Sequence, residues 1–443
     1  MPVFFGSSSY QVEFIGLMCF DSSPLQKGAI MMEDREIFSL GLGLRAPWEV
    51  MSQHLDTAKT PQELHLELAA DRGSLFPCPK CGKTCPAHDF KELRWRHLNF
   101  FQHHCLLTAK VPRICCPEHG VKRIVVPWAR QGSHFTLLFE QVVMSLVREM
   151  PVAAAARLVG ERDTRLWRII QHYVGKALES LDLSELAAFG FDETASKRGQ
   201  NYVTVFVDMK RRTQPVVFAT PGKGKQCVKD FKTWLQAHGG SAENVTEVVC
   251  DMSPAFLAAV GEEFEHANVT VDWFHVVQLF TTAVDAVRKL EYQQTKLPKA
   301  TRWAVLKSKG LTAKQQLALQ ELEEGDFLTT IAWRIKEKLR WVRQAQTLRA
   351  ARWRMTHFLH HARSMLTTAP ALDAIRKALN TLHAHIPLIL QRWTSTYSNA
   401  RMEGLNSLFQ AARARARGYR NTQTFSTMIY LIAAPIQFIF NST

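Results

Sequence analysis

Three acidic residues stand where carboxylates can hold divalent cations. Asp192 ends the apolar run "LAAFGFD", Asp251 ends "TEVVCD", and Glu403 lies in the stretch "YSNARMEGLNSLFQAARARARGYRN". A carboxylate at the end of a buried strand loses hydration unless a cation or hydrogen bonds compensate it. Paired metal ions held by such acids activate the attacking oxygen and stabilise the leaving oxygen in phosphoryl transfer. A strand-end cap or a surface ion pair explains each acid taken alone, so their order along the chain carries the prediction.

Cations surround Glu403. The stretch that contains it carries five arginines and otherwise has the composition of a helix. Arginines at such a place neutralise the phosphates of a nucleic-acid backbone. We therefore expect DNA contacts from four of them, the last three following Glu403 at helical spacing: Arg401, Arg413, Arg417 and Arg420.

A cluster of cysteines predicts a structural metal site. "CPKCG" supplies Cys78 and Cys81, and "ICCPEHG" supplies Cys116 and His119 further along the chain. Two knuckles of this form, each ending in glycine, are typical of a closed tetrahedral zinc site with no open position for catalysis. The alternative is a group of free, buried thiols. Three further cysteines remain alternative ligands: Cys85, Cys105 and Cys115.

The segment "MPVAAAARLVGERDTRLWRIIQHYV" has the pattern of a short helix, a turn at Gly160 and a second helix from about Asp163. This is the shape of a helix-turn-helix, whose second helix lies in the major groove of DNA. Arg162, Arg165 and Arg168 would then reach phosphates or base edges. Alanine-rich helical hairpins also occur without DNA, so the assignment depends on the other basic features of the chain.

The overall composition favours an anionic partner. The chain of 443 residues has a net charge of +15 and a pI near 9.5, and nucleic acid is the commonest partner of such a protein. No cationic segment precedes the apolar N-terminus, and the apolar run "TMIYLIAAPIQFIF" is too short to span a membrane. An odd count of nine cysteines, partly clustered, indicates a reducing compartment. We expect a cytoplasmic protein.

The order of apolar patterns predicts an α+β multidomain protein, with strands in the middle of the chain and helices late. Its last helix returns after a long helical insertion. That insertion contains Trp303, Trp333, Trp341 and Trp353, most of which we expect in its core, although exposed rings would stack on bases. We expect residues 1–36 to be an N-terminal extension that is either disordered or the product of a mis-assigned start codon. The further expected parts are a zinc-ribbon segment (37–130), a helix-turn-helix (131–180), the first part of the catalytic core (181–294), the insertion (295–390) and the last part of the core with a C-terminal helix (391–443).

The sequence resembles the DDE transposases of bacterial insertion sequences, in particular the group called ISL-three. The resemblance runs from about Ile37 to the C-terminus and rests on "LGLRAPWEV", both cysteine knuckles, "GFDETASKRGQNYVTVFVD", "VVCDMSPAF", "VDWFHVVQLFTTAVDAVR" and "SNARMEGLNS…RGYRN". It implies an RNase H-like mixed-sheet core in which Asp192, Asp251 and Glu403 bind two Mg²⁺ ions, with Mn²⁺ as a substitute. The "DWFH" motif ends in His275, for which a contact with DNA or the scissile region is implied.

These features together predict a transposase. The zinc ribbon and helix-turn-helix would read the terminal inverted repeats of the element, and water would hydrolyse the strand at its end. The freed 3′-hydroxyl would then attack target DNA. Pairing of two ends requires a homodimer or higher oligomer, at the nucleoid of a bacterial cytoplasm. Two alternatives stay open: a domesticated DNA-binding regulator without catalysis, and a structure-specific nuclease on the same core.

Overall fold

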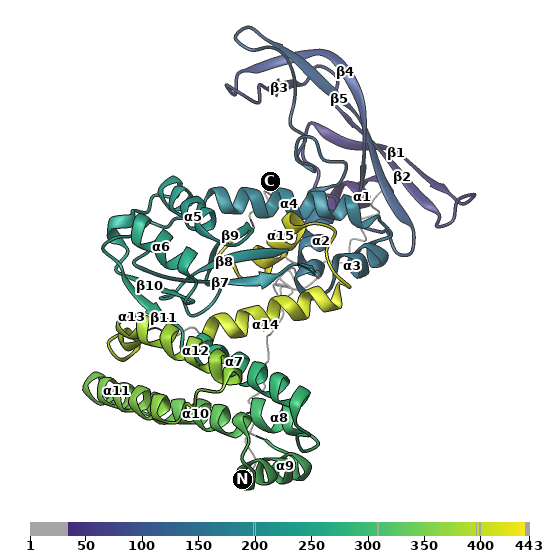
Figure 1. The fold of residues 1–443 in the computed structure, drawn as a ribbon. Helices are drawn as coiled ribbons and strands as arrows, with labels where there is room; N and C mark the ends of the chain where they lie inside the picture. The colour runs from purple at the N-terminus through teal and green to yellow at the C-terminus, as the bar shows by residue number, and fades with distance from the viewer. Residues whose placement is uncertain are drawn as a thin grey trace, which may run out of the picture. The chain divides into compact units, whose positions relative to one another are not determined.

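The computed structural model describes residues 34–197, 199, 201–307, 310–395, 397 and 400–438. Most of the expected N-terminal extension therefore lies outside the described residues, and α1 (Asp34–Gly41) begins at its end. The chain forms two compact units, Met1–His134 and Phe135–Thr443 (Figure 1).

The first unit is a six-stranded sheet built around a long hairpin. Its strands are β1 (Trp48–Asp56), β2 (Glu63–Ala70), β3 (Leu75–Pro77), β4 (Thr84–Arg96), β5 (His104–Cys116) and β6 (Gly120–Arg123). The order is β1-β2-β5-β4-β3, with β6 also paired to β5. The ring of Trp128 meets those of Trp48 and Trp95 edge-on, with centroids 4.8 and 5.6 Å apart. These three buried indoles supply much of the core of this unit.

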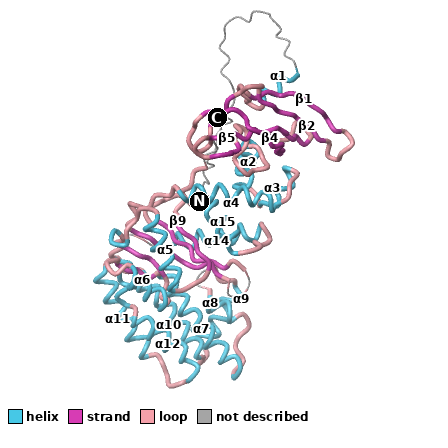
Figure 2. Tube along the Cα trace, turned by 90° about the horizontal axis from the view of Figure 1, so that it is seen from above, coloured by secondary structure: helices cyan, strands magenta, loops and turns pink. Residues whose placement is uncertain are grey.

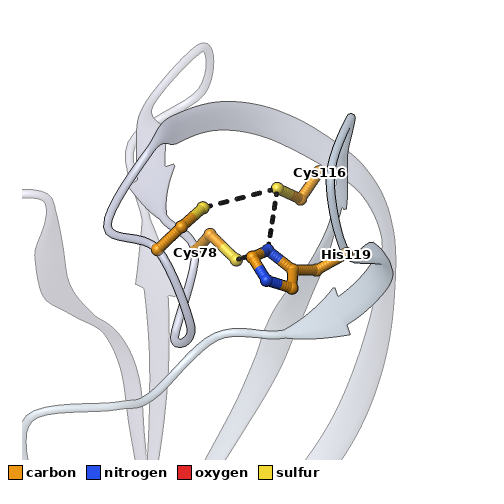
Figure 3. A group of neighbouring side chains, drawn as sticks. Cys78, Cys116 and His119 are labelled. Carbon is orange, nitrogen blue, oxygen red and sulfur yellow. Dashed lines mark hydrogen bonds between the residues drawn. The ribbon is translucent and has the colours of Figure 1, made fainter.

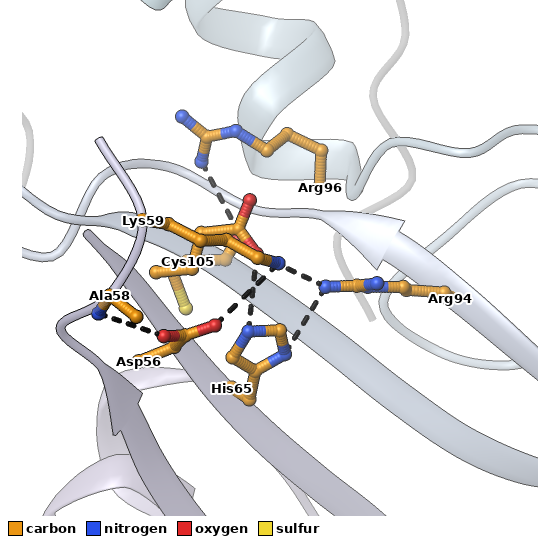
Figure 4. Close-up of polar contacts among 8 residues, drawn as sticks. Asp56, Ala58, Lys59, His65, Arg94, Arg96 and Cys105 are labelled. Carbon is orange, nitrogen blue, oxygen red and sulfur yellow. Dashed lines mark hydrogen bonds and ion pairs between the residues drawn. The ribbon is translucent and has the colours of Figure 1, made fainter. Parts of the chain in front are cut away.

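A charged network ties β2 to β4 across β5. Glu63 on β2 accepts a hydrogen bond of 2.6 Å from Lys59, and Arg94 on β4 reaches both Glu63 and His65 (Figure 4). Burial acts to raise the pKa of Glu63, but the Lys59 hydrogen bond and the nearby cations hold that pKa below its ordinary value. The negative charge of Glu63 thus holds three cationic or ionisable side chains on one face of the sheet.

The second unit begins with three helices, α2 (Leu137–Glu149), α3 (Val152–Val159) and α4 (Asp163–Glu179). The predicted helical pair is α3 and α4, and Gly160 ends α3 with φ of 69°, in the left-handed region that favours glycine. Tyr173 of α4 donates a hydrogen bond of 2.8 Å to Glu140 of α2, and both side chains are buried. This arrangement is the helix-turn-helix that the sequence predicts.

A mixed five-stranded sheet follows. It contains β7 (Ala188–Ala195), β8 (Tyr202–Asp208), β9 (Val216–Pro221), β10 (Glu247–Cys250) and β11 (Asn268–Val271), in the order β11-β10-β7-β8-β9. The strands β7, β8 and β9 are antiparallel, whereas β10 and β11 run parallel to β7. Two helices, α5 (Lys225–Ala237) and α6 (Pro254–Glu263), connect the later strands. This is the RNase H-like mixed sheet expected from the sequence.

Phenylalanines pack one face of this sheet against α5 and α6. Phe206 of β8 stacks on Phe231 of α5, with ring centroids 4.4 Å apart. Phe189 and Phe191 of β7 point to the same side, where they meet Phe231 and Phe256. Side chains alternate along a strand, so Asp192 and Thr194 of β7 face the opposite side of the sheet.

A helical insertion follows β11. Its helices are α7 (Trp273–Gln294), α8 (Thr301–Leu306), α9 (Ala313–Glu324), α10 (Leu328–Arg343), α11 (Leu348–Ser364), α12 (Asp373–Ala384) and α13 (Ile386–Leu390). The long helices lie side by side in both views (Figures 1 and 2), and α7, α10, α11 and α12 share one apolar core. The buried Glu291 of α7 accepts hydrogen bonds from the backbone N–H groups of Leu328 and Thr329, which fixes the start of α10.

The insertion's tryptophans depart from the sequence-based expectation. Trp333 packs against the apolar core, but Trp303, Trp341 and Trp353 are 49%, 37% and 55% exposed. The expectation that most of them form core was therefore wrong. Helical spacing fixes which residues share a face of a helix, but not whether another helix covers that face.

Two helices complete the second unit, α14 (Ala400–Arg415) and α15 (Thr422–Ala433). The first half of the apolar C-terminal run, residues 427–433, forms the end of α15, which is buried along most of its length. The N–H of Ala219 in β9 donates a hydrogen bond of 2.7 Å to the hydroxyl of Tyr430. Among the described residues, every helix is too short or too polar to cross a lipid bilayer.

Candidate active site and metal centre

Three aspartates lie in one row across neighbouring strands of the second unit. The parallel pairing of β10 with β7 and β11, continued past the last paired residues, aligns Asp251 with Asp192 and with Asp272. The N–H of Asp272 extends this pairing with a 3.1 Å hydrogen bond to the carbonyl of Cys250. Residues in the same row of a sheet point to the same face. Asp251 follows the last residue of β10 as predicted, whereas Asp192 lies within β7, which continues to Ala195. The structure thus places the two predicted aspartates in one row and adds a third.

The helix α14 lies along β7 on the face that carries Asp192. Asn406 donates a 2.8 Å hydrogen bond to Oδ2 of Asp192, and Gln410 donates one of 2.7 Å to the hydroxyl of Thr194. Arg413 donates to the carbonyl of Ala195, at the end of the same strand. These three donors are spaced four and three residues apart, so they occupy one face of α14. Side chains from that face hold the helix on the strand.

Glu403 belongs to the same face of α14, three residues before Asn406. Its carboxyl is exposed, yet partial desolvation and the negative charge of Asp272 raise its pKa, while His275 and Arg343 act to lower it. Burial also raises the pKa of Asp192, and the charge of His275 opposes that rise. The pKa values of Asp192 and Glu403 are therefore both shifted by the same two neighbours, Asp272 and His275. This places both predicted acids beside the first turn of α7.

The chemistry of this set fits a hard divalent cation such as Mg²⁺, which prefers carboxylate oxygen. Asp272 is 6% exposed, and its Oδ2 is buried with no hydrogen-bond partner among the described residues. A buried carboxylate oxygen without a partner is costly unless a cation compensates it. In the described part of the chain, the oxygens of no three of these acids lie within 4.8 Å of one another. The acids are gathered on one face, at separations wider than a shared ion requires.

A second constellation lies in the first unit, where ligand atoms of four side chains lie within 4.8 Å of one another: Cys78, Cys81, Cys116 and His119 (Figure 3). The Sγ atoms of Cys81 and Cys116 are 3.6 Å apart, and His119 Nδ1 lies 3.7 Å from the Sγ of Cys116. Ideal zinc bond lengths give tetrahedral edges of about 3.6–3.8 Å. The four predicted ligands therefore have the spacing of a tetrahedral zinc site.

Local backbone geometry explains why these ligands converge. Gly82 and Gly120 follow the second ligand of each knuckle, and both have positive φ, at 73° and 65°. Glycine adopts this conformation without steric cost, which lets each knuckle fold back on itself. Cys115 points away because it alternates with Cys116 along β5, and it is exposed. Cys85 and Cys105 are buried outside the cluster of ligand atoms.

The predicted DNA-contacting residues of the helix-turn-helix lie in different surroundings. Arg162 and Arg168 are exposed at the start of α4. Arg165 instead forms an ion pair with Glu161 at 2.5 Å and lies over the ring of Phe135, 4.3 Å from its centroid. Arg165 is thus engaged within the unit, whereas Arg162 and Arg168 present their side chains to solvent.

A cavity of about 370 Å³ separates α4 from the loop between α14 and α15. Its lining includes Trp167, Arg168 and Gln171 from α4 and Tyr419, Arg420 and Asn421 from the loop. The rings of Trp167 and Tyr419 meet edge-on at 6.2 Å. Two guanidinium groups, two amides and two aromatic rings thus surround one hollow beside the helix-turn-helix.

The expected helical row of arginines after Glu403 does not form. The helix α14 ends at Arg415, and Arg417 adopts φ of 57° in the chain reversal that follows. The N–H of Gly418 closes this reversal on the carbonyl of Arg413 at 2.8 Å. Arg420 therefore lies in the loop after α14. Arg413 donates to the backbone of β7, so Arg413 and Arg420 do not share one face of a helix. Arg401 is in the first turn of α14, and its side chain lies outside the described residues.

Sequence reasoning missed several residues at this site. Asn406 is detectable only through its spacing from Glu403 on a helix whose partner strand is known. Asp272 also ends an apolar run, as Asp192 and Asp251 do, but in the sequence it stands out only as the first residue of the "DWFH" motif. Arg343, at the end of α10, comes from an insertion whose fold brings it to Glu403. No local pattern marks that residue.

Carboxylates gathered on one face of an RNase H-like sheet, in a chain with a helix-turn-helix, are typical of proteins that cut or join DNA. Family comparisons identify the class further. A transposase model of family ISL3 matches residues 189–429, and the helix-turn-helix domain model of the same family matches 125–174. A zinc-finger model of transposases IS204/IS1001/IS1096/IS1165 matches 74–119. The chain belongs to the ISL3 family of insertion-sequence transposases.

Individual relatives are transposases as well. The chain is 24% identical over 361 residues to the transposase for insertion sequence element IS1001 of Bordetella parapertussis, covering 79% of this chain and 86% of that one. It is 30% identical over 219 residues to the transposase for IS1557 of Mycobacterium tuberculosis, covering 48% of each. A solved viral intasome in complex with a PP2A regulatory subunit matches at 15% identity, over 40% of this chain and 74% of that one. Its TM-score of 0.16 is too low to indicate a shared fold.

Proposed function

We propose that this protein is a DNA transposase that binds the terminal inverted repeats of its insertion sequence and catalyses Mg²⁺-dependent strand cleavage and strand transfer. The observation that supports this most directly is the 2.8 Å hydrogen bond between Asn406 and Asp192. It joins the helix of Glu403 to the strand of the first aspartate. Membership of the ISL3 transposase family supports the same reaction class.

In this proposal Asp192, Asp251 and Glu403 hold two Mg²⁺ ions, for which Mn²⁺ can substitute. When bound, the ions polarise the scissile phosphate and lower the pKa of the attacking water or 3′-hydroxyl. Asn406 fixes one oxygen of Asp192, and the N–H of Ser253 fixes one oxygen of Asp251 at 2.9 Å. Both carboxylates are thereby oriented before the substrate arrives, which is the protein's contribution to a reaction of this kind.

Cations near the acids position the substrate's phosphates. His275 and Arg343 lie close enough to Glu403 to lower its pKa, and Arg343 also acts on Arg392. Burial, and secondarily repulsion from Arg343, lowers the pKa of Arg392, while the charge of Asp272 opposes this. Two guanidinium groups held near each other are stabilised by an anion between them. We propose that the DNA strand next to the scissile phosphate lies on the side of the active site formed by Arg343 and Arg392.

DNA recognition is assigned to the N-terminal modules. Arg162 and Arg168 of the helix-turn-helix would contact bases and phosphates of the repeat, and Arg420 would contact the backbone beside them. The Cys/His cluster would hold a structural Zn²⁺ that folds the ribbon. Joining two element ends requires at least a homodimer, which would act at the nucleoid in the bacterial cytoplasm.

The test is a cleavage assay on duplexes that carry the DNA flanking the gene, with and without Mg²⁺, in which strand breaks are mapped. Glu403→Gln should abolish metal-dependent breaks at the repeat ends, while Glu265→Gln, at an acid 76% exposed in its ion pair with His266, should not. Binding without breaks would contradict catalysis and indicate a regulator. Breaks at branched DNA without defined ends would indicate a structure-specific nuclease.

A further inference from the structure

We propose that Asp272 is a fourth carboxylate of the active site, which binds a divalent cation together with Asp192 and Asp251. This inference rests on the proposed function, because it concerns the same metal site. It adds to the triad a residue that the sequence marked only as the start of the "DWFH" motif. Four observations on Asp272 carry it: its register, its buried oxygen, its neighbours and its position as a helix cap.

The register places Asp272 in line with the other two aspartates. The strand β11 runs parallel to β10, and the N–H of Asp272 donates a 3.1 Å hydrogen bond to the carbonyl of Cys250, the residue before Asp251. Adjacent parallel strands lie about 4.8 Å apart, and Asp251 lies in the middle of the row, between Asp192 and Asp272. Because, among the described residues, oxygens of no three of these acids lie within 4.8 Å of one another, the carboxylates would move toward a cation as it binds. The row Asp192–Asp251–Asp272 faces the side of the sheet where α14 carries Glu403.

One oxygen of Asp272 has a protein partner and the other does not. Its Oδ1 accepts a hydrogen bond of 3.2 Å from the N–H of Phe274 and so caps α7. Its Oδ2 is buried without a hydrogen-bond partner in the described part of the chain, and the residue is only 6% exposed. A carboxylate removed from water in this way is strongly disfavoured unless a positive charge meets it.

The groups that face Asp272 come from several elements. Carboxylates approach from β7 and α14, because the charge of Asp272 raises the pKa of both Asp192 and Glu403. The cation of Arg392 is close enough for Asp272 to act on its pKa, but no ion pair of Asp272 within 4.0 Å occurs among the described residues. Asp192, Asp251 and Glu403 thus share this site with His275, Arg343 and Arg392, yet none of these basic side chains forms an ion pair with Asp272 in the described part of the chain.

The cap alone does not explain an aspartate at this position. Asn and Ser cap helix N-termini as well as Asp does, and neither carries a charge. The structure contains a matched comparison in Asp208, the last residue of β8. Its Oδ1 accepts the N–H of Lys210, two residues on, at 2.8 Å, and its Oδ2 is paired with Arg211 at 3.2 Å. Asp208 and Asp272 share the same turn, but only Asp208 has a cation on its second oxygen.

The experiment is a titration of the full-length protein with Mn²⁺, in which bound ion is measured by electron paramagnetic resonance without any DNA. Asp272→Asn keeps the cap and the volume of the side chain but removes the charge, and Asp272→Ser keeps only the cap. We expect both to bind Mn²⁺ at least tenfold more weakly than the unmodified chain. The control Asp208→Asn should bind it normally.

Thermal melting gives a second readout that a purely structural role would not produce. In metal-free buffer, Asp272→Asn should melt at a higher temperature than the unmodified protein, because an uncompensated buried charge is gone. Addition of Mn²⁺ should then raise its melting temperature less than that of the unmodified protein. A lower melting temperature without metal, with a normal response to Mn²⁺, would overturn the assignment and leave Asp272 as a helix cap.

The outcomes separate this inference from the proposed function. Asp192→Asn is measured alongside as the reference for the triad. Loss of Mn²⁺ in Asp192→Asn but full binding in Asp272→Asn would overturn the role of Asp272 alone. Full binding in Asp192→Asn as well would mean that the metal site is wrongly placed, and the proposed two-metal reaction would fall with it.

Discussion

Asn406 of α14 donates a hydrogen bond from its side-chain amide to Oδ2 of Asp192, with 2.8 Å between the two heavy atoms. The residues are 214 positions apart, and the whole helical insertion lies between them in the sequence. This contact places the helix that carries Glu403 directly on the central strand of the sheet. Asn406, the hydrogen-bond partner of Asp192, therefore also sets the position of Glu403 on the same helix.

The first prediction concerns this contact. Asn406→Ala should reduce the rate of strand cleavage by about 5- to 150-fold, because a loss of about 1–3 kcal/mol in a partly buried hydrogen bond frees Asp192 to rotate. Single-turnover cleavage at saturating Mg²⁺ measures it. Gln410→Ala is the matched control, since Gln410 holds the same helix at Thr194 instead of at an acid. Equal losses in both variants would show that Asn406 only stabilises the helix.

A second prediction concerns the Cys/His cluster. Cys81→Ser should remove about one zinc ion per chain, because a structural site needs all four ligands. It should also destabilise the first unit by several kcal/mol, since zinc binding is coupled to folding. Cys115→Ser changes the neighbouring exposed thiol, which points away from the cluster, and should retain the metal. Zinc release measured with a chromogenic chelator distinguishes the two, and loss of zinc in Cys115→Ser would contradict the ligand assignment.

A third prediction separates the arginines beside the helix-turn-helix. Arg168→Ala should lower discrimination between repeat and random DNA by about 1–3 kcal/mol, as expected for a base contact. Arg420→Ala should weaken binding to all sequences and reduce the salt slope by about 1, as expected for a phosphate contact. Arg165→Ala should alter stability instead, because that side chain is paired with Glu161. Fluorescence anisotropy across a salt series measures these effects; an unchanged slope in Arg420→Ala would remove the loop from the DNA interface.

A fourth prediction concerns pH and the first unit. Burial, and secondarily the charge of Arg96, lowers the pKa of His97 to about 4 from its usual 6.5. The unfolded chain therefore binds a proton more readily between these two values, and the folded state loses stability as the pH falls through this window. The loss is at most about 2 kcal/mol between pH 6.5 and 5.

His97→Gln removes the titrating group and should flatten this part of the stability curve. Both proteins keep the zinc ligands, so the difference between their melting temperatures at pH 7 and pH 5 isolates His97. The unmodified chain should lose more on acidification than the variant. Equal losses in the two proteins would mean that folding does not lower the pKa of His97.

Some of the site was predictable because the signals are local. An acid that follows an apolar run stands out in the sequence, so Asp192 and Asp251 could be selected, although only Asp251 lies at a strand end and β7 continues past Asp192 to Ala195. Each metal-binding knuckle is a run of five residues, "CPKCG" or "CPEHG", that contains both ligands and the glycine that lets the chain fold back. The four metal-ligand candidates of the first unit therefore came from spacing alone.

The remainder depends on contacts between distant segments. Nothing near Asn406 shows that β7 will lie against its helix. The end of α14 was also hidden, because Arg417 takes the left-handed position where glycine is usual. Exposure of Trp341 and Trp353 depends on which helices cover α10 and α11, and periodicity does not record that.

The measurement that tests the central claim most directly replaces Mg²⁺ with Fe²⁺ and adds ascorbate and peroxide. Radicals formed at the bound ion cut the polypeptide only nearby, and the cuts are mapped by mass spectrometry. The account predicts cuts in three segments distant in sequence, at Asp192, Asp251 and Glu403, all suppressed by excess Mg²⁺. Cuts at the two aspartates with none in α14 would contradict the assembly of this site by the Asn406–Asp192 contact.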